Sequence, residues 1–187
     1  MANVDRPNGF KVVKTLSGAP ISSMMRSIGV TDGTDMFVGD VITLTSGLAA
    51  VTASNDTAIL GVAMGFGKKA QMSNQVSGPF NADSLMTRYY DDSASTHTDW
   101  VVYYVPIDDV VLEAQTATAL TKLVGETVDI LATAGDTVSG QSRQEITTSS
   151  NADFTVVEIP SYPDNDPTAV WGRYWVMVTR AEQAFHA

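Results

Sequence analysis

The sequence has no cysteine among its 187 residues and only two histidines, His97 and His186. The absence of cysteine excludes disulfides, thiol catalysis and thiolate metal sites together. Stability must therefore come from packing or from assembly with other chains.

Positive charge is also scarce, because 11 Lys and Arg residues face 21 Asp and Glu residues, for a net charge of -10. Nucleic acids and anionic membranes are bound through clustered Lys and Arg side chains. Only Lys68 and Lys69 are adjacent here, and the other basic residues are scattered. We therefore expect neither a nucleic acid nor a membrane as a partner.

Long apolar runs are missing as well. The longest, residues 58–66, is far shorter than the roughly 20 residues that a helix needs to cross a bilayer. The first twenty residues are charged and are broken by Pro7, Gly9 and Pro20, so they do not form a secretory signal. We expect a protein that is made in a cytoplasm.

Residues that favour β-strands are abundant, and residues 39–51 show this most clearly. β-Branched and apolar residues alternate with a period of two over residues 41–45, and Ser46-Gly47 supplies a tight turn before a short apolar return. Gly61 and Gly65 in the next segment predict a bulge or the close approach of another backbone.

Further strands are expected at residues 100–105, 110–114, 127–131, 154–159 and 171–178. Many short strands between turns predict an all-β protein with a β-sandwich or jelly-roll-like body and a smaller β-hairpin module. The expected organisation is an extended N-terminal arm (1–23), a small β-module and linker (24–83) and a β-sandwich body (84–187). No internal repeat is evident.

Candidate chemical groups are few, and each has a plain structural alternative. His97 lies near Asp91, Asp92 and Asp99, where a metal ion or a hydrolytic site is imaginable, but no second histidine is suitably spaced. Asp108 and Asp109 point to opposite faces of a strand, so they would not share a substrate. We expect no enzyme activity.

Oxygen-rich loops and a single serine complete the candidates. The acidic residues at 32–40 and 164–166 lack the glycine and closing glutamate of an EF-hand. Ser142 lacks the flanking glycine of a nucleophile elbow. The sequence therefore predicts no catalytic residues, no metal site and no cofactor.

Residues 1–13, which lead into a polar arm, and residues 100–115 resemble segments of capsid cement proteins, also called head decoration proteins, of tailed double-stranded DNA phages. A glycine turn at 123–125, residues 137–142, the strand at 154–159 and a closing aromatic strand follow in the order that these proteins have. Residues 67–99 carry no match.

The resemblance implies a structural virion protein that binds the outer surface of the head. Such proteins clamp neighbouring subunits of the major capsid protein, usually as trimers, so the expected partners are the major capsid protein and two further copies of this chain. Many symmetric copies convert weak individual contacts into strong reinforcement of a shell. The expected location is the outside of the capsid after synthesis in a host cytoplasm.

Apolar residues in the predicted arm are candidates for contact with the capsid or a sister subunit, because the arm has little local structure to bury them. These candidates are Phe10, Val12, Val13 and Leu16. A carbohydrate-binding or host-adhesion module stays open as an alternative function. Its stacking surface would come from Trp171, Trp175, Tyr174 or Tyr162.

Overall fold

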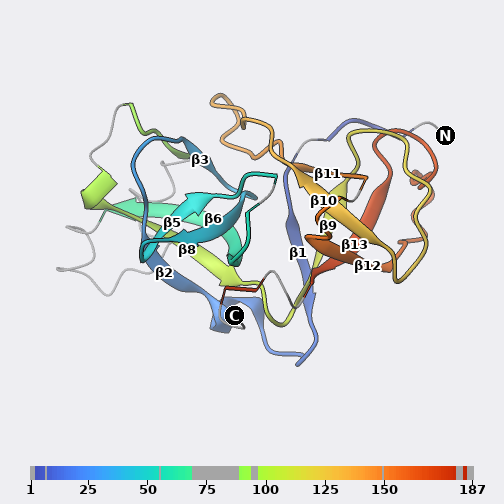
Figure 1. Ribbon diagram of the computed structural model, residues 1–187, viewed down its shortest axis with the longest axis horizontal. Helices are drawn as coiled ribbons and strands as arrows, with labels where there is room; N and C mark the ends of the chain where they lie inside the picture. The colour runs from blue at the N-terminus through green and yellow to red at the C-terminus, as the bar shows by residue number, and fades with distance from the viewer. Residues whose placement is uncertain are drawn as a thin grey trace.

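The protein was analysed as a computed structural model that describes residues 3–6, 8–54, 56–68, 89–93, 97–148, 150–179 and 183–184. The prediction of an all-β protein is confirmed. Within these ranges the helical segments are short: α1 (Ile21–Met24) and the 3-10 turn η1 (His97–Asp99). Figure 1 shows two groups of strands, one on each side of β1.

The first group, which we call the first unit, is a five-stranded antiparallel sheet with the order β2-β8-β6-β4-β5. Its strands are β2 (Arg26–Gly29), β4 (Val41–Thr45), β5 (Leu48–Val51), β6 (Ile59–Lys68) and β8 (Trp100–Pro106). A parallel bridge from Val30 to Ala49 joins its two ends, so the sheet curls toward a small barrel. A short ribbon of β3 (Met36–Phe37) and β7 (Tyr89–Tyr90) lies beside it.

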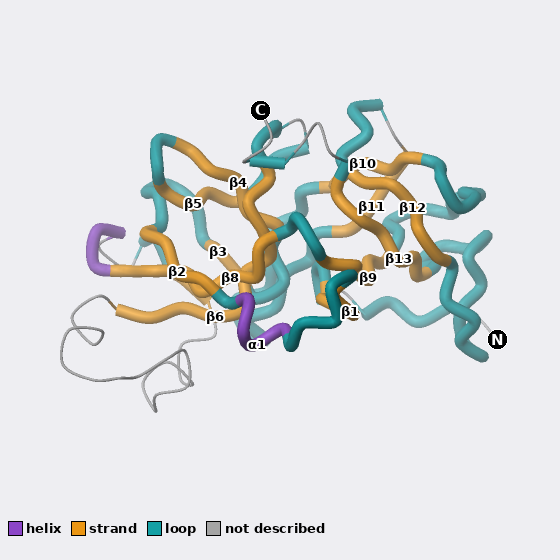
Figure 2. Tube along the Cα trace, turned by 90° about the horizontal axis from the view of Figure 1, so that it is seen from below, coloured by secondary structure: helices purple, strands orange, loops and turns teal. Residues whose placement is uncertain are grey.

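The second unit is built from five strands in the same way. They are β9 (Val110–Gln115), β10 (Thr127–Leu131), β11 (Glu145–Thr148), β12 (Phe154–Glu158) and β13 (Arg173–Val178). Together with β1 (Lys11–Thr15) they form a six-stranded sheet with the order β1-β9-β13-β12-β10-β11. A parallel bridge from Thr116 to Ile146 joins β9 to β11 and curls this sheet too. In Figure 2 the two units lie next to each other.

The two units share more than a strand order. In each, the first strand of the unit pairs with the fifth, the fifth with the fourth, the fourth with the second and the second with the third, always antiparallel. A bulge interrupts the pairing of the fourth and fifth strands at the same step, at 63–65 in the first unit and at 156–158 in the second. The molecule therefore contains an internal structural repeat, although no repeat is evident in the sequence.

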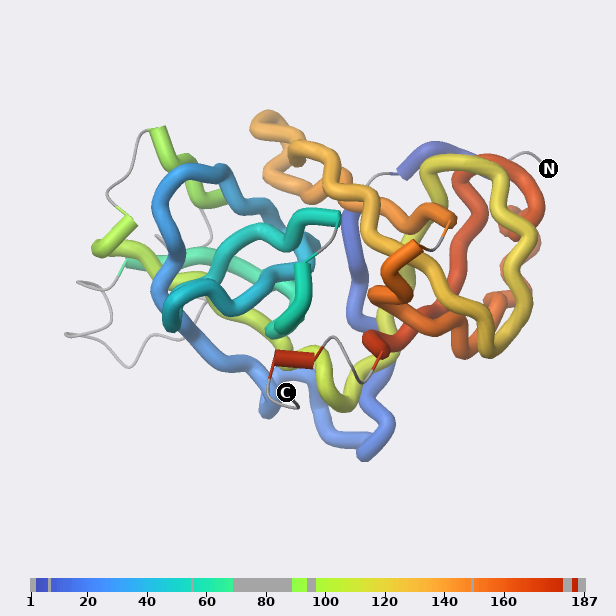
Figure 3. The backbone as a smooth tube through the Cα atoms, viewed as in Figure 1, coloured from blue at the N-terminus to red at the C-terminus, as the bar shows by residue number. Residues whose placement is uncertain are grey.

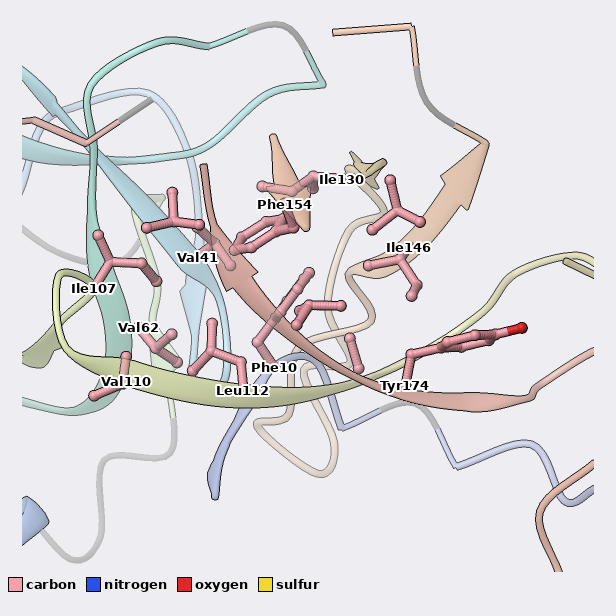
Figure 4. Close-up of a cluster of buried hydrophobic side chains, with 14 of the residues drawn as sticks. Phe10, Val41, Val62, Ile107, Val110, Leu112, Ile130, Ile146, Phe154 and Tyr174 are labelled. Carbon is pink, nitrogen blue, oxygen red and sulfur yellow. The ribbon is translucent and has the colours of Figure 1, made fainter. Parts of the chain in front are cut away.

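Successive side chains along the strands of the first unit point alternately into two different hydrophobic clusters. Ile42, Leu60 and Ala63 face one cluster inside the first unit, whereas their neighbours Val41 and Val62 face a second cluster. This second cluster also contains the interior of the second unit, and it joins the two units through continuous apolar packing (Figure 4). Both faces are thus buried over residues 41–43 of β4 and 59–63 of β6, as the apolar sequence of these segments indicates.

The ends of the chain cross between the units, as Figure 3 shows. β1 precedes the first unit in sequence but pairs with β9 of the second. Near the other end, Gln183 forms a bridge with Ile59 of the first unit. Each unit is therefore completed by a segment from the far end of the chain.

Sheet membership does not follow the boundaries expected at residues 23 and 83. β1, from the expected arm, belongs to the second unit, and β8, from the expected body, belongs to the first. The reason is long-range strand pairing, which local sequence patterns do not encode. The linker expected at the end of the 24–83 module is the polar stretch 67–83, and it lies outside the described residues except for 67 and 68, which end β6.

Candidate functional site

The predicted contact residues of the arm lie mostly inside the protein. Phe10 is 2% exposed and stacks on Phe154 with 5.1 Å between ring centroids, and Val12 is 9% exposed. Because β1 is a paired strand, its inward side chains enter the core of the second unit. The prediction of partner contact is therefore corrected for Phe10 and Val12. Val13 is half-buried and Leu16 is 59% exposed, so for these two it stays a prediction.

The most elaborate polar site lies where the units meet, under the connection between β10 and β11. We call this connection, residues 132–144, the junction loop. Ser142 N–H donates to the Val38 carbonyl at 2.9 Å, and Val38 N–H donates to the Gly140 carbonyl at 3.3 Å. Gln144 accepts from Val41 N–H at 2.7 Å through its side-chain oxygen. The junction loop is thus held on the first unit by backbone pairing and a buried amide.

Asp40 is the ionisable group at the centre of this contact and is 2% exposed. Its carboxylate accepts Phe37 N–H at 2.7 Å and a hydrogen bond from the Ser142 side chain. Burial raises the pKa of Asp40 to about 6, although both hydrogen bonds act in the opposite direction. The junction therefore contains a carboxyl group that titrates near neutral pH.

A cavity of about 700 Å³ opens beside Asp40, between the first unit and the junction loop. Phe37, Val51 and several alanines give it apolar walls, and Asp35 and Asp92 contribute further carboxylates. Among the described residues, no histidine, lysine or arginine lines it. The described lining therefore combines apolar walls with carboxylates, hydroxyls and the Gln144 amide.

The acidic residues near His97 serve to order loops. His97 Nδ1 lies 3.6 Å from Asp32, Asp92 N–H donates to Asp35 at 2.9 Å, and Gly33 N–H donates to Asp92 at 2.9 Å. The Gly33 N–H bond, opposed by burial, lowers the pKa of Asp92. Within the described ranges no three His, Asp or Glu side chains converge as metal ligands.

The other polar candidates are likewise structural. Asp109 accepts Ser17 N–H at 3.2 Å and fixes the end of β1, while Asp108 lies exposed beside it. In the acidic loop, Asp164 pairs with Arg173 at 2.6 Å, which holds the pKa of that carboxyl below its usual value. Ser142 is fully buried in the junction, where its hydroxyl accepts the N–H of Gln144. It is therefore a structural residue and does not form a nucleophile elbow.

The aromatic candidates divide into buried and exposed residues. Tyr174 is 1% exposed and donates its hydroxyl to the carbonyls of Leu120 and Pro167, so it is removed from any stacking surface. Tyr162 and Trp175 both donate to Glu113, at 2.9 and 3.0 Å. Lys14 Nζ lies 4.8 Å above the Trp175 ring, so one face of this half-buried ring is occupied.

Trp171 differs from the other aromatic residues. Its side chain is 38% exposed and its backbone has a φ of 62°, which is rare for a bulky residue. It lines a groove of about 170 Å³ together with Val4, Arg6 and Arg173.

One structural feature near the junction was missed from the sequence: a turn that occurs once in each unit. Residues 37–40 and 123–126 each place an apolar residue, Val, Gly and an acid directly before the second strand of their unit. The N–H of the first residue donates to the carboxylate of the fourth in both turns. The signal available in the sequence was the repeated Val-Gly-acid triplet.

Comparisons with known proteins identify no relative of this chain. No protein-family model, curated protein or solved structure matches the chain. In the part of the chain that is described, no helix has the length and apolar character to span a membrane.

Proposed function

We propose that the protein is a structural component of a tailed-phage virion that binds the outer surface of the head and bridges subunits of the major capsid protein. The observation that carries the proposal is that polar side chains are buried between the units while large apolar side chains are exposed. The buried polar groups of the junction hold the two units together, while large apolar side chains remain exposed on separate turns. The most exposed of these are Leu16, Leu123, Val124 and Val138.

Exposed apolar side chains on a rigid scaffold are typical of proteins whose function is assembly. The crossing of the chain ends supports the same function, since it ties each unit to the other and resists their separation. The resemblance of residues 1–13 and 100–115 to cement proteins supports it independently.

The experiment is co-sedimentation of the purified protein with expanded heads that lack it. Saturable binding is expected, and heads that already carry the protein are the control. Absence of binding to bare expanded heads would refute the proposal. Deletion of residues 2–16 is unsuitable as a test, because it would remove β1 and Phe10 from the core; Leu16→Ser probes the same region on the surface.

The proposed assembly is a homotrimer. Light scattering coupled to size exclusion should give three times the chain mass of 19.9 kDa, either free in solution or after release from heads. A monomeric mass in both samples would contradict it.

A carbohydrate-binding function is the second candidate, and the groove beside Trp171 favours it. An exposed indole with two nearby arginines combines a stacking surface with hydrogen-bond donors. A glycan array should then show binding that Trp171→Ala abolishes and Trp175→Ala retains. An array without signal would eliminate this candidate.

A further inference from the structure

The two copies of the repeated turn have different surroundings. We call residues 37–40 the covered turn and residues 123–126 the open turn. In both, the glycine has a positive φ, 92° at Gly39 and 94° at Gly125. Both glycine N–H groups donate to the fourth strand of their unit, Gly39 to Ala63 at 2.9 Å and Gly125 to Val156 at 2.8 Å.

The covered turn is a filled docking site. The junction loop adds to it in parallel, with Gln141 bridging to Val38. Small residues allow this approach, because a side chain at Gly135 would collide with the Phe37 ring at 2.3 Å. As a result Phe37 is only 4% exposed.

The open turn presents the same backbone, and no described segment covers it. Leu123 is 68% exposed and Val124 is 62% exposed. A side chain added at Gly125 would meet no atom within 4 Å, whereas one at Gly39 would lie 2.5 Å from the Asn8 carbonyl. Among the described residues, neither the N–H nor the carbonyl of Val124 has a hydrogen-bond partner.

The described chain has no second loop to fill this site. The connection of the first unit that corresponds to the junction loop is the two-residue turn Ser46-Gly47. The junction loop of another copy is already engaged within its own chain. Because no described segment of this chain is left to fill the site, a different protein is favoured as the occupant.

We propose that the open turn is a docking site for an extended segment of a partner protein, which pairs in parallel with the backbone of Val124 and covers Leu123. The chemistry of the segment follows from the filled site. It places small residues such as Gly and Ser on either side of the pairing position, as Gly140 and Ser142 do around Gln141. Identification of the partner as the capsid shell rests on the proposed function.

The test compares the double substitution Leu123→Ser, Val124→Ser with the control Val170→Ser, which changes a 40% exposed valine outside the set assigned to capsid binding. Both should keep the melting temperature, because the altered side chains are exposed. The double variant should bind expanded heads at least about tenfold more weakly, and the control should bind normally. Equal binding by the double variant would overturn the docking site and leave the proposed function intact.

Hydrogen exchange provides a second readout on the complex with heads. The Val38 amide should exchange slowly in the free protein, and the Val124 amide should exchange fast when free and slowly when bound. An unprotected Val124 amide on heads would also overturn the proposal.

If the unaltered protein does not bind heads, the proposed function fails and a peptide of residues 136–144 decides the docking site. This peptide contains the segment that fills the covered turn. Amide shifts at Val124 and Gly125 that a scrambled peptide does not produce would support the site, and their absence at millimolar peptide would refute it.

Discussion

The two units of this molecule have the same strand order, register and bulge, but they stabilise equivalent positions with opposite chemistry. Thr43 in β4 corresponds to Asp129 in β10. The Thr43 hydroxyl donates to the carbonyls of Thr57 and Ala58, each at 3.0 Å. The Asp129 carboxylate instead accepts N–H groups from residues 150–152.

Large and small side chains also exchange places between equivalent core positions of the two units. Gly61 of the first unit and Phe154 of the second both pair with the second strand at the same step. The Tyr104 ring occupies the space at Gly61, where an added side chain would lie 2.7 Å from it, whereas its counterpart in the second unit is the smaller Val176. The comparison teaches that backbone pairing defines the unit, and that side chains can change if volume and hydrogen bonds are conserved.

The largest expected effect concerns the equivalent positions 43 and 129, where the Thr43 side chain donates hydrogen bonds and the Asp129 side chain accepts them. Asp129→Ala should destabilise the protein by about 3 kcal/mol, because one carboxylate that accepts several part-buried N–H groups is lost. Thr43→Val should cost only about 1 kcal/mol, since it removes one neutral donor. Urea unfolding at pH 7 measures both, and equal losses would contradict the assigned role of the carboxylate.

The dependence on pH gives a second check on Asp129. Burial raises the pKa of this carboxyl, but the N–H groups of Ser150, Asn151 and Ala152 outweigh that effect and lower the pKa below the ordinary 3.8. A lowered pKa stabilises the fold above the unfolded-state pKa, and this stability is lost as the pH falls through the folded-state value. The difference between Asp129→Ala and the unaltered protein should therefore shrink in acid.

The next effect compares the acids of the two turns, buried Asp40 and exposed Glu126. Because the pKa of Asp40 is raised from 3.8 to about 6, the folded state holds its proton more tightly than the unfolded state in that range. Stability therefore falls as the pH rises from 4 to 6 and stays low above it. Asp40→Asn should be more stable than the unaltered protein by up to about 3 kcal/mol at pH 7.5 and equally stable near pH 4.

Thermal unfolding at both pH values makes the measurement, with Glu126→Gln as the matched removal of one carboxylate. Asn keeps an oxygen that can accept Phe37 N–H, so the turn is preserved. A loss of stability at pH 7.5 would show that the ionised carboxylate is needed at the junction.

Much of the secondary structure could be predicted from the sequence because its causes are local. The hairpin of β4 and β5 turns at Ser46 and Gly47, which both have positive φ, as a two-residue turn requires. The bulge expected near Gly61 and Gly65 is present at 63–65. These features follow from residues within a few positions of each other.

Pairings between distant segments could not be predicted. Phe10 looked like an exposed anchor because its partner, Phe154, is remote in sequence. The repeated turn escaped notice because two Val-Gly-acid triplets carry little information until the shared register shows their equivalence. The open turn was consequently invisible as a site, since its only signal is the contrast with a covered copy.

The smallest expected effect tests the equivalence of the units at a single hydroxyl. Thr116 corresponds to Val30, since both form the parallel bridge that closes their sheet. Thr116 is fully buried, and its hydroxyl has no hydrogen-bond partner in the described structure. Thr116→Val should therefore stabilise the protein by about 1 kcal/mol, because a buried hydroxyl without a partner is costly.

The reverse exchange in the first unit, Val30→Thr, should destabilise by a similar or larger amount, since Val30 is 1% exposed. Urea midpoints of the two variants should move in opposite directions if the positions are equivalent in environment. A destabilising Thr116→Val would mean that the second unit satisfies this hydroxyl and that the closing bridge is built differently from its copy. If Thr116→Val stabilises the protein, the two units repeat the packing around the closing bridge as well as the backbone. If it destabilises the protein, they repeat the backbone alone.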